Sequence, residues 1–211
     1  MKIEIGNFER KDYKKAVQFA EVGMHSEWFW PGKALMLADM KYFLYTELLE
    51  ATQIMAARAD GQFAGVLLAA MRGEEKPCRS RSVRRFVRRT DRLLKLIGRG
   101  AVGEYEKTAK EQRERSREML RPDGEILFFA VDPRLEGKGI GSALLAELER
   151  REAGRSIYLL TDDACSWEFY DHRGFRQTEE KDIVIEAPKG SVPLRCFVYY
   201  KVMGQEAGVE R

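Results

Sequence analysis

Three glycines at alternate positions, Gly137, Gly139 and Gly141, have the spacing in this chain that most directly suggests chemistry. They lie in LFFAVDPRLEGKGIGSALLAELERR (127–151), between an apolar segment typical of a buried strand and an alanine- and leucine-rich helix. At the start of a helix the backbone N–H groups have no helical partner, and the helix dipole adds positive potential. Glycine lets an anion approach these amides, and Lys138 adds a positive charge. The stretch therefore predicts a site for a phosphate or pyrophosphate group.

Two known phosphate-binding motifs match this stretch poorly. A P-loop requires GxxxxGK followed by Ser or Thr, but Lys138 is followed by Gly139. A dinucleotide-binding fold is a closer alternative, because Asp162 ends a predicted strand 21 residues after Gly141, about where an acid would bind a ribose. However, five residues separate the preceding strand from the first glycine, and Ser142 replaces the third glycine of GxGxxG.

A third class of site fits better. The segment VDPRLEGKGIGSALL (131–145) resembles the acyl-CoA-binding signature of the GNAT N-acetyltransferase superfamily, in which a strand ending near a proline leads to (Q/R)xxGx(G/A) and a helix. Downstream, FYDHRGF (169–175) resembles the family's second signature, a helix that ends in aromatic-Tyr-x-x-x-Gly-Phe. The strong resemblance covers about residues 125–176. It implies an α/β (α+β) fold with a mixed, mostly antiparallel central sheet flanked by helices, and it implies acetyl-CoA (coenzyme A) as the cofactor.

The resemblance implies cofactor-binding residues on the strand, the turn and the helix. The strand should present a backbone N–H near Ala130 or Val131 to the thioester carbonyl, as an oxyanion donor. Asp163 stands where many members place an asparagine near coenzyme A. Glu136 stands where the family has Gln or Arg, and we expect its side chain to turn to solvent. The implied cofactor-binding residues are Phe129, Ala130, Val131, Gly137, Lys138, Gly139, Ile140, Gly141, Ser142 and Asp163.

Acetyl transfer to an amine also needs a proton donor for the departing thiolate and a proton acceptor for the amine. The resemblance implies that Tyr170 of FYDHRGF is the general acid. The base is left open between Glu125, at the start of the central strand, and Glu27 or His25 in the segment HSEWFW. We interpret Cys165 as a small packing residue rather than a nucleophile, because direct transfer is the habit of the family.

The acceptor amine should bind opposite the cofactor, between the two N-terminal helices and the C-terminal strand pair. The aromatic residues available to line that site are Trp28, Phe29, Trp30, Tyr42 and Tyr45. Core packing is the expected role of at least half of them. The amine itself cannot be read from these side chains.

Hydrophobic periodicity and turn residues predict the elements that must position this site. The first half should contain a strand, two helices and a hairpin around the turn dipeptide Asp60-Gly61, at 2–6, 12–30, 33–51, 53–59 and 62–71. The last third should contain a strand, a helix, a strand, a short helix and a closing strand pair, at 125–131, 139–153, 156–161, 164–174, 175–187 and 194–202. We expect residues 1–211 to form a single acetyltransferase domain.

A basic insertion interrupts this order at residues 73–121, and its sequence favours helices. Residues 72–121 contain 17 lysines and arginines against 8 acids, although the net charge of the whole chain is only +3. In RSVRRFVRRTDRLLKLIG (81–98) the apolar residues share one helical face and the arginines lie on the others. We expect the apolar stripe to pack on the core or across a homodimer. A surface for an acidic acceptor or for the CoA 3′-phosphate is a second interpretation, and nucleic acid or an anionic membrane is a less favoured one.

Composition is that of an ordinary globular protein, with 44% hydrophobic and 34% charged residues. No apolar run approaches the roughly 18 residues of a membrane span, and the N-terminus lacks the apolar core of a signal peptide. Three cysteines without a CxxC pair and only two histidines argue against disulfides and a metal site. We therefore expect a cytoplasmic protein.

Two functional hypotheses follow. The first is an acetyl-CoA-dependent N-acetyltransferase that transfers an acetyl group directly to a primary amine of a small molecule or a protein. The alternative is a non-catalytic acyl-CoA-binding module that recruits a partner through the basic helical insertion.

Overall fold

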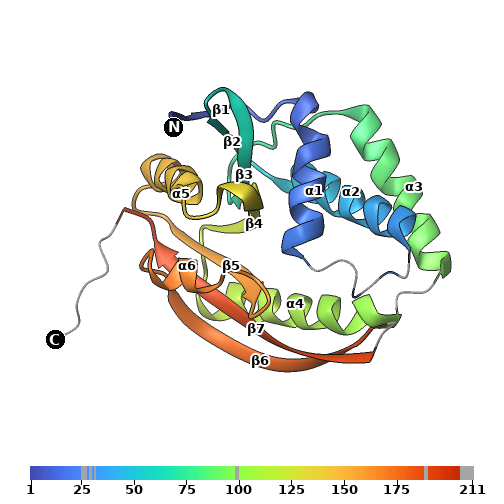
Figure 1. Ribbon diagram of the computed structural model, residues 1–211. Coiled ribbons are helices and arrows are strands. Elements are labelled where there is room, and N and C mark those ends of the chain that lie inside the picture. Colours follow the sequence, from blue (N-terminus) through green and yellow to red (C-terminus); the bar gives the residue numbers. More distant parts are fainter. Residues whose placement is uncertain (25–27, 29, 31, 98–99, 188–189, 205–211) are drawn as a thin grey trace.

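A seven-stranded sheet forms the centre of the computed structural model, which describes residues 1–24, 28, 30, 32–97, 100–187 and 190–204 (Figure 1). The strands are β1 (Ile3–Gly6), β2 (Gln53–Ala59), β3 (Gln62–Met71), β4 (Gly124–Val131), β5 (Ser156–Asp162), β6 (Arg176–Ala187) and β7 (Gly190–Val202). They lie in the order β1-β2-β3-β4-β5-β7-β6, and only β4 and β5 are parallel neighbours. The mixed, mostly antiparallel sheet that the sequence predicts is confirmed.

Helices cover both faces of this sheet. On one face α1 (Tyr13–Gly23) and α2 (Lys33–Glu50) pack with β3 residues that include Val66 and Leu68. On the other face α5 (Ile140–Arg151) packs with the alternate β3 residues Leu67 and Ala69. This alternation follows from the two-residue period of a strand. At Gly65 a Cβ would lie 3.1 Å from a leucine methyl of α5, so this helix approaches β3 closely there.

The predicted β2–β3 hairpin is present with its predicted bounds, and its turn residues Asp60 and Gly61 both have positive φ, 48° and 79°. The first helix is shorter than predicted, because it ends at Gly23 and Met24 already leaves the helical conformation with φ −110° and ψ 9°. Glycine is a poor helix former, which accounts for the early end.

The closing strand pair is longer than predicted, because β7 begins at Gly190 and includes Pro193. Proline has no backbone N–H and is tolerated where a strand has a free side. Pairing of β7 with β5 covers only Cys196–Val202, whereas pairing with β6 extends to Gly190. Pro193 therefore lies where β7 has a single neighbour.

Two helices occupy the region of the insertion, α3 (Arg81–Ile97) and α4 (Gly100–Met119). The first packs along α2, where Val83 is buried and the Phe86 ring lies 5.2 Å from that of Tyr45. Packing of its apolar stripe on the chain's own helices thus agrees with the simplest expectation from the sequence.

The second insertion helix, α4, lies across β6 and also contacts β5 and β7 (Figure 1). Its buried face is polar: Thr108, Gln112 and Ser116 are each at most 3% exposed and follow one another at intervals of four residues. Gln112 Nε2 donates a hydrogen bond of 3.4 Å to the carbonyl of Cys196 in β7. The insertion therefore covers the sheet on the half formed by β5, β7 and β6.

Candidate active site

The two parallel strands at the centre of the sheet separate along their length. Pairing of β4 with β5 covers only Gly124–Ile126 against Ile157–Leu159, although β4 continues to Val131 and β5 to Asp162. On its other side β4 stays paired with β3 as far as Val131, with an irregularity next to Ile126. The second half of β4, which contains the predicted residues Phe129, Ala130 and Val131, therefore has backbone groups on the β5 side that no strand pairs. Such groups can bind an extended ligand.

The glycine-rich turn follows at the end of β4 and leads into α5. Gly137 and Gly139 have φ values of 72° and 81°, a conformation that residues with a side chain rarely adopt. Gly139 is the N-cap of α5 and no side chain caps it, and the first bond of the helix runs from the Ala143 N–H to the Gly139 carbonyl at 3.0 Å. The amides of residues 139–142 are therefore available to an anion, as the sequence predicts for this turn.

Two cations lie at this turn, and the sequence reasoning found only one of them. Lys138 is exposed, and so is Glu136, whose side chain is turned to solvent as expected. Arg173, between α6 (Glu168–Asp171) and β6, donates a hydrogen bond to the Ser142 hydroxyl on the first turn of α5. Its guanidinium also lies 5.4 Å from the Phe169 ring centre. Arg173 belongs to the segment FYDHRGF, so the second signature already contained this signal.

Tyr170 lies on α6 in an aromatic cluster next to the divergent strands. Its ring centre is 5.5 Å from that of Phe169 and 5.7 Å from that of Tyr199, and the Phe169 ring in turn lies 5.7 Å from that of Phe129 on β4. Burial raises the pKa of Tyr170, and a nearby Cys165 adds to this effect. The phenol therefore keeps its proton at neutral pH, which a general acid requires.

Glu125 lies at the closed end of the divergence and is 5% exposed. Its carboxylate accepts hydrogen bonds from Arg113 Nε at 2.7 Å, from Arg117 Nη2 at 3.5 Å and from the Tyr158 hydroxyl at 2.5 Å. Both arginines belong to α4. Glu125 thus lies where β4 and β5 begin to separate. Its carboxylate oxygens already accept three hydrogen bonds, and this arrangement suits a positioning role.

Glu47 on α2 is a titratable group that the sequence reasoning missed. Burial raises the pKa of its carboxyl from 4.5 to about 7; Arg113 opposes this rise and Glu125 adds to it. A carboxyl that titrates near neutral pH is suited to proton transfer. A weak signal was present in the sequence, because Glu47 lies three residues after Leu44, on the helical side that Leu44 and Leu48 bury.

Other predicted residues have structural partners. Asp163 Oδ1 accepts a hydrogen bond of 3.0 Å from the backbone N–H of Arg195, and its Oδ2 pairs with the Arg195 guanidinium at 3.4 Å. Its contact with coenzyme A stays a prediction. The Cys165 thiol donates to the Gly23 carbonyl at 3.3 Å, and burial, followed by Asp162, raises its pKa. A thiol held in its protonated form is a poor nucleophile.

The aromatic residues near the N-terminal helices mostly pack or hold helices together. Trp30 is buried and its indole donates to Asp39 at 3.0 Å, and the Tyr42 hydroxyl donates to Asp91 of α3 at 3.3 Å. The Tyr45 ring makes edge-to-face contacts with Tyr13 of α1 and with Phe86 of α3. Trp28 differs, because it packs against the cluster of apolar side chains between α4 and the β6–β7 hairpin. The candidates His25, Glu27 and Phe29 lie outside the described residues.

The described part of the chain contains no group of three or more His, Cys, Asp or Glu side chains arranged to hold a metal ion. None of the helices in that part combines the length and the apolar character that a membrane crossing needs.

Comparisons with known proteins agree with this architecture. The acetyltransferase (GNAT) family model matches residues 23–175. The ribosomal-protein-S18-alanine N-acetyltransferase from Escherichia coli superposes with a TM-score of 0.55 at 12% identity, covering 100% of this chain and 99% of that one. An agmatine N-acetyltransferase superposes with a TM-score of 0.58 at 12% identity, covering 94% and 99%. The PaiA N-acetyltransferase from Thermoplasma acidophilum, solved in complex with coenzyme A, gives 0.51 at 15% identity, covering 96% and 100%.

No curated protein sequence matches the chain. Identities this low show a shared fold only, but the family model covers well over half of the chain and includes both the glycine-rich turn and Tyr170. The chain is therefore a member of the acetyltransferase (GNAT) family.

Proposed function

We propose that this protein is an acetyl-CoA-dependent N-acetyltransferase that transfers the acetyl group directly to a primary amine of a small molecule or a protein. The observation that carries the proposal is that two binding features follow one another along the chain. The second half of β4 has backbone groups on the β5 side that no strand pairs, and the glycine-rich turn after β4 leads to the amides at the start of α5 that are available to an anion. An extended ligand with a pyrophosphate at one end fits both at once. In this arrangement Lys138 and Arg173 supply positive charge beside the phosphates.

When bound, acetyl-CoA supplies a thioester whose carbonyl carbon can accept a nucleophile. A backbone N–H near Ala130 or Val131 stabilises the negative charge that develops on the carbonyl oxygen. The acceptor nitrogen forms the new C–N bond as the C–S bond breaks. Tyr170, which burial keeps protonated at neutral pH, gives its proton to the departing sulfur. The acceptor nitrogen loses one proton, so the balance requires a base on the other side of the thioester.

Glu47 is our candidate for that base, in place of a direct role for Glu125. Its pKa near 7 lets it exist as a carboxylate at neutral pH and still hold a proton once it has taken one. Arg113 interacts with both glutamates. It forms an ion pair of 2.7 Å with Glu125 and a longer-range electrostatic interaction with Glu47. We assign Glu125 and Arg113 to the positioning of Glu47 and of the acceptor.

The first test is a calorimetric titration with acetyl-CoA, with NAD as the control ligand. Micromolar binding of acetyl-CoA alone supports the site, whereas NAD binding or no binding contradicts it. The second test measures thiol release from acetyl-CoA with a panel of primary amines, including agmatine and a peptide with a free N-terminal alanine. With any acceptor found, Tyr170→Phe should lower kcat by roughly 100-fold, the usual scale of general acid catalysis. Unchanged turnover across the pH range would refute the acid role.

A specific observation favours a second candidate function. The exposed arginines of α3 form a surface outside the proposed active site. This supports the alternative of a non-catalytic acyl-CoA-binding module that recruits a partner. Binding of acetyl-CoA with no turnover for any amine of the panel would favour that alternative.

A further inference from the structure

The arginines of α3 are exposed and form no ion pair with any acid that the structure describes. They are Arg81, Arg84, Arg85, Arg88, Arg89 and Arg92. The acid of this helix, Asp91, accepts a hydrogen bond of 3.3 Å from the Tyr42 hydroxyl. Residues 81–93 therefore contain six arginines and one acid.

The arginines of α4, the other helix of the insertion, differ from those of α3 because they form ion pairs. In α4 the arginines pair with acids of the sheet, as Arg113 does with Glu125 at 2.7 Å and Arg115 with Glu179 at 3.1 Å. Like charges at intervals of four residues destabilise a helix, and α3 contains several such pairs. A surface helix that merely needed to be soluble would be expected to alternate its charges as α4 does. The unpaired arginines of α3 therefore indicate an anionic partner.

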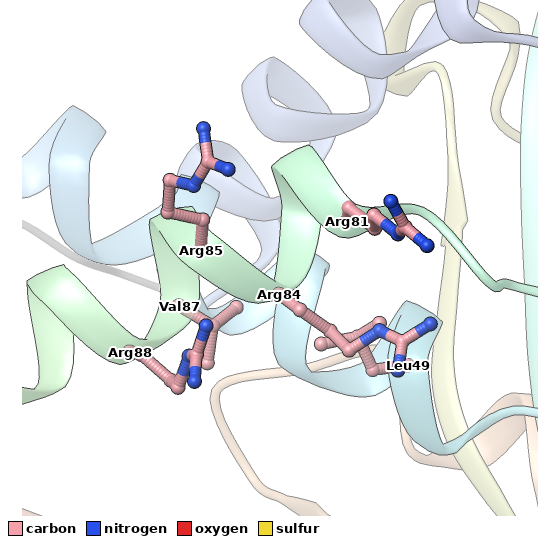
Figure 2. Close-up of a pocket in the computed structure, with 6 residues that line it drawn as sticks. All are labelled: Leu49, Arg81, Arg84, Arg85, Val87 and Arg88. Carbon is pink, nitrogen blue, oxygen red and sulfur yellow. The ribbon is translucent and has the colours of Figure 1, made fainter.

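Two shallow hollows beside these arginines narrow the kind of partner. The first, of about 400 Å³, is lined by Leu49, Val87 and four arginines of α3. Figure 2 shows Arg84 beside Leu49 and Arg88 beside Val87, whereas Arg81 and Arg85 extend away from both. A second hollow of about 390 Å³ lies on the same helix and is lined by Ser82, Arg85, Phe86, Arg89, Thr90 and Leu93. Leu93 is 52% exposed. Each hollow thus combines an apolar floor with a basic rim.

We infer that α3 and the adjoining end of α2 form a docking surface for an acidic protein segment with apolar side chains at helical spacing. The carboxylates of such a segment would pair with the guanidinium groups, which suit bidentate carboxylate binding. Its apolar side chains would fill the two hollows, in the way that an amphipathic helix places anchors in a groove. The surface therefore fits a partner that carries both carboxylates and apolar side chains.

Two other anionic partners match the surface less well. An amphipathic helix binds a membrane through a free apolar face, but Val83 and Phe86 of α3 pack on α2. Nucleic acid binds mainly through phosphates, and phosphate contacts need no apolar floor. The floors formed by Leu49, Val87 and Leu93 are therefore better explained by apolar side chains of a protein partner.

The experiment measures fluorescence anisotropy of a labelled 16-residue peptide titrated with the full chain. The peptide has glutamates throughout and leucines at i, i+4, i+7 and i+11, and a second peptide has serines in place of the leucines. A 16-base-pair duplex and phosphatidylserine vesicles serve as the other anions. We expect the leucine peptide to bind most tightly. The substitutions Arg84→Gln, Arg85→Gln and Arg88→Gln together should weaken it by roughly tenfold or more, the scale of three exposed charge contacts.

A matched control removes three exposed charges elsewhere, with Lys107→Gln, Arg121→Gln and Arg176→Gln, and should leave peptide binding within twofold. Leu93→Ser should weaken the leucine peptide but not the serine peptide. Equal binding of both peptides, tighter binding of the duplex or the vesicles, or no peptide binding would each overturn the inference. Calorimetry with acetyl-CoA should give the same affinity for both triple variants, so this result is separate from the test of the active site.

Discussion

Glu47 gives the sharpest test of the proposed active site, because its neutral form and its charged form should differ in their effect on folding. Burial raises the pKa of its carboxyl from 4.5 to about 7, Arg113 of α4 opposes this rise, and Glu125 of β4 adds to it. Below pH 4.5 the carboxyl is protonated in the folded and in the unfolded chain. Between pH 4.5 and 7 only the folded chain keeps the proton, so the free energy of unfolding falls as the pH rises through this window.

The size of this fall follows from the shift of the pKa. At about 1.4 kcal/mol for each pKa unit, the rise from 4.5 to about 7 corresponds to about 3 kcal/mol of stability that is present at pH 4 and absent at pH 8. Glutamine has the same shape but carries no charge. Glu47→Gln should therefore be more stable than the natural chain by about 3 kcal/mol at pH 8 and equally stable at pH 4.

Urea unfolding of both chains between pH 4 and pH 8, followed by circular dichroism, measures this difference. Glu118→Gln is the control, because Glu118 is exposed on α4 and its neutralisation should change little at any pH. A stability difference between Glu47→Gln and the natural chain that does not change with pH would refute the buried-carboxyl argument. If Glu47 is also the base, the more stable variant should be the less active one, with kcat reduced by roughly 100-fold.

Three further changes test other parts of the site. Arg113→Gln leaves the 5% exposed Glu125 with Arg117 and Tyr158 only, so urea unfolding at pH 7 should show a loss of about 2 kcal/mol; no loss would contradict the ion pair. Gly139→Ala places a side chain at φ 81°, which should cost about 1 kcal/mol and weaken acetyl-CoA binding in calorimetry. Unchanged affinity would show that this turn does not hold the pyrophosphate. Cys165→Ser should keep kcat within about twofold, whereas loss of turnover would indicate a covalent acetyl-enzyme.

The sequence predicts the parts of this molecule whose signals are local. The alternate glycines, the Asp60-Gly61 turn and the segment around Tyr170 each combine residue type and position within a few residues. Glu47 and Arg113 could not be found in this way, because their roles depend on contacts between α2, β4 and the inserted α4. Helical periodicity places Glu47 on the side of α2 that Leu44 and Leu48 bury, but it does not show which charged groups surround the carboxyl.

The same limit applies to Glu125, whose role as the base stays a prediction. At the start of a strand an acid is most often a solvated strand end, and only the position of α4 supplies its arginine partners. The segment 104–119 reads as a polar, charge-alternating helix, which gives no indication that one of its faces is buried against β5, β6 and β7. A polar helix can pack on a sheet when the sheet itself offers polar partners, and here Glu125 and the Cys196 carbonyl do so.

The two helices of the insertion therefore differ in their relation to the proposed site. Helix α4 contributes residues to it, whereas α3 does not. Arg113 contributes to the electrostatics of both Glu47 and Glu125, so a change in the position of α4 would alter the pKa of Glu47 directly. In contrast, α3 is held by its apolar stripe against α2, the helix that carries Glu47. A partner docked on the arginines of α3 would contact the helix that packs on α2, and α2 carries the proposed base Glu47. Partner binding and catalysis would then both depend on α2. Acetyl transfer should therefore be measured with and without the acidic leucine peptide bound.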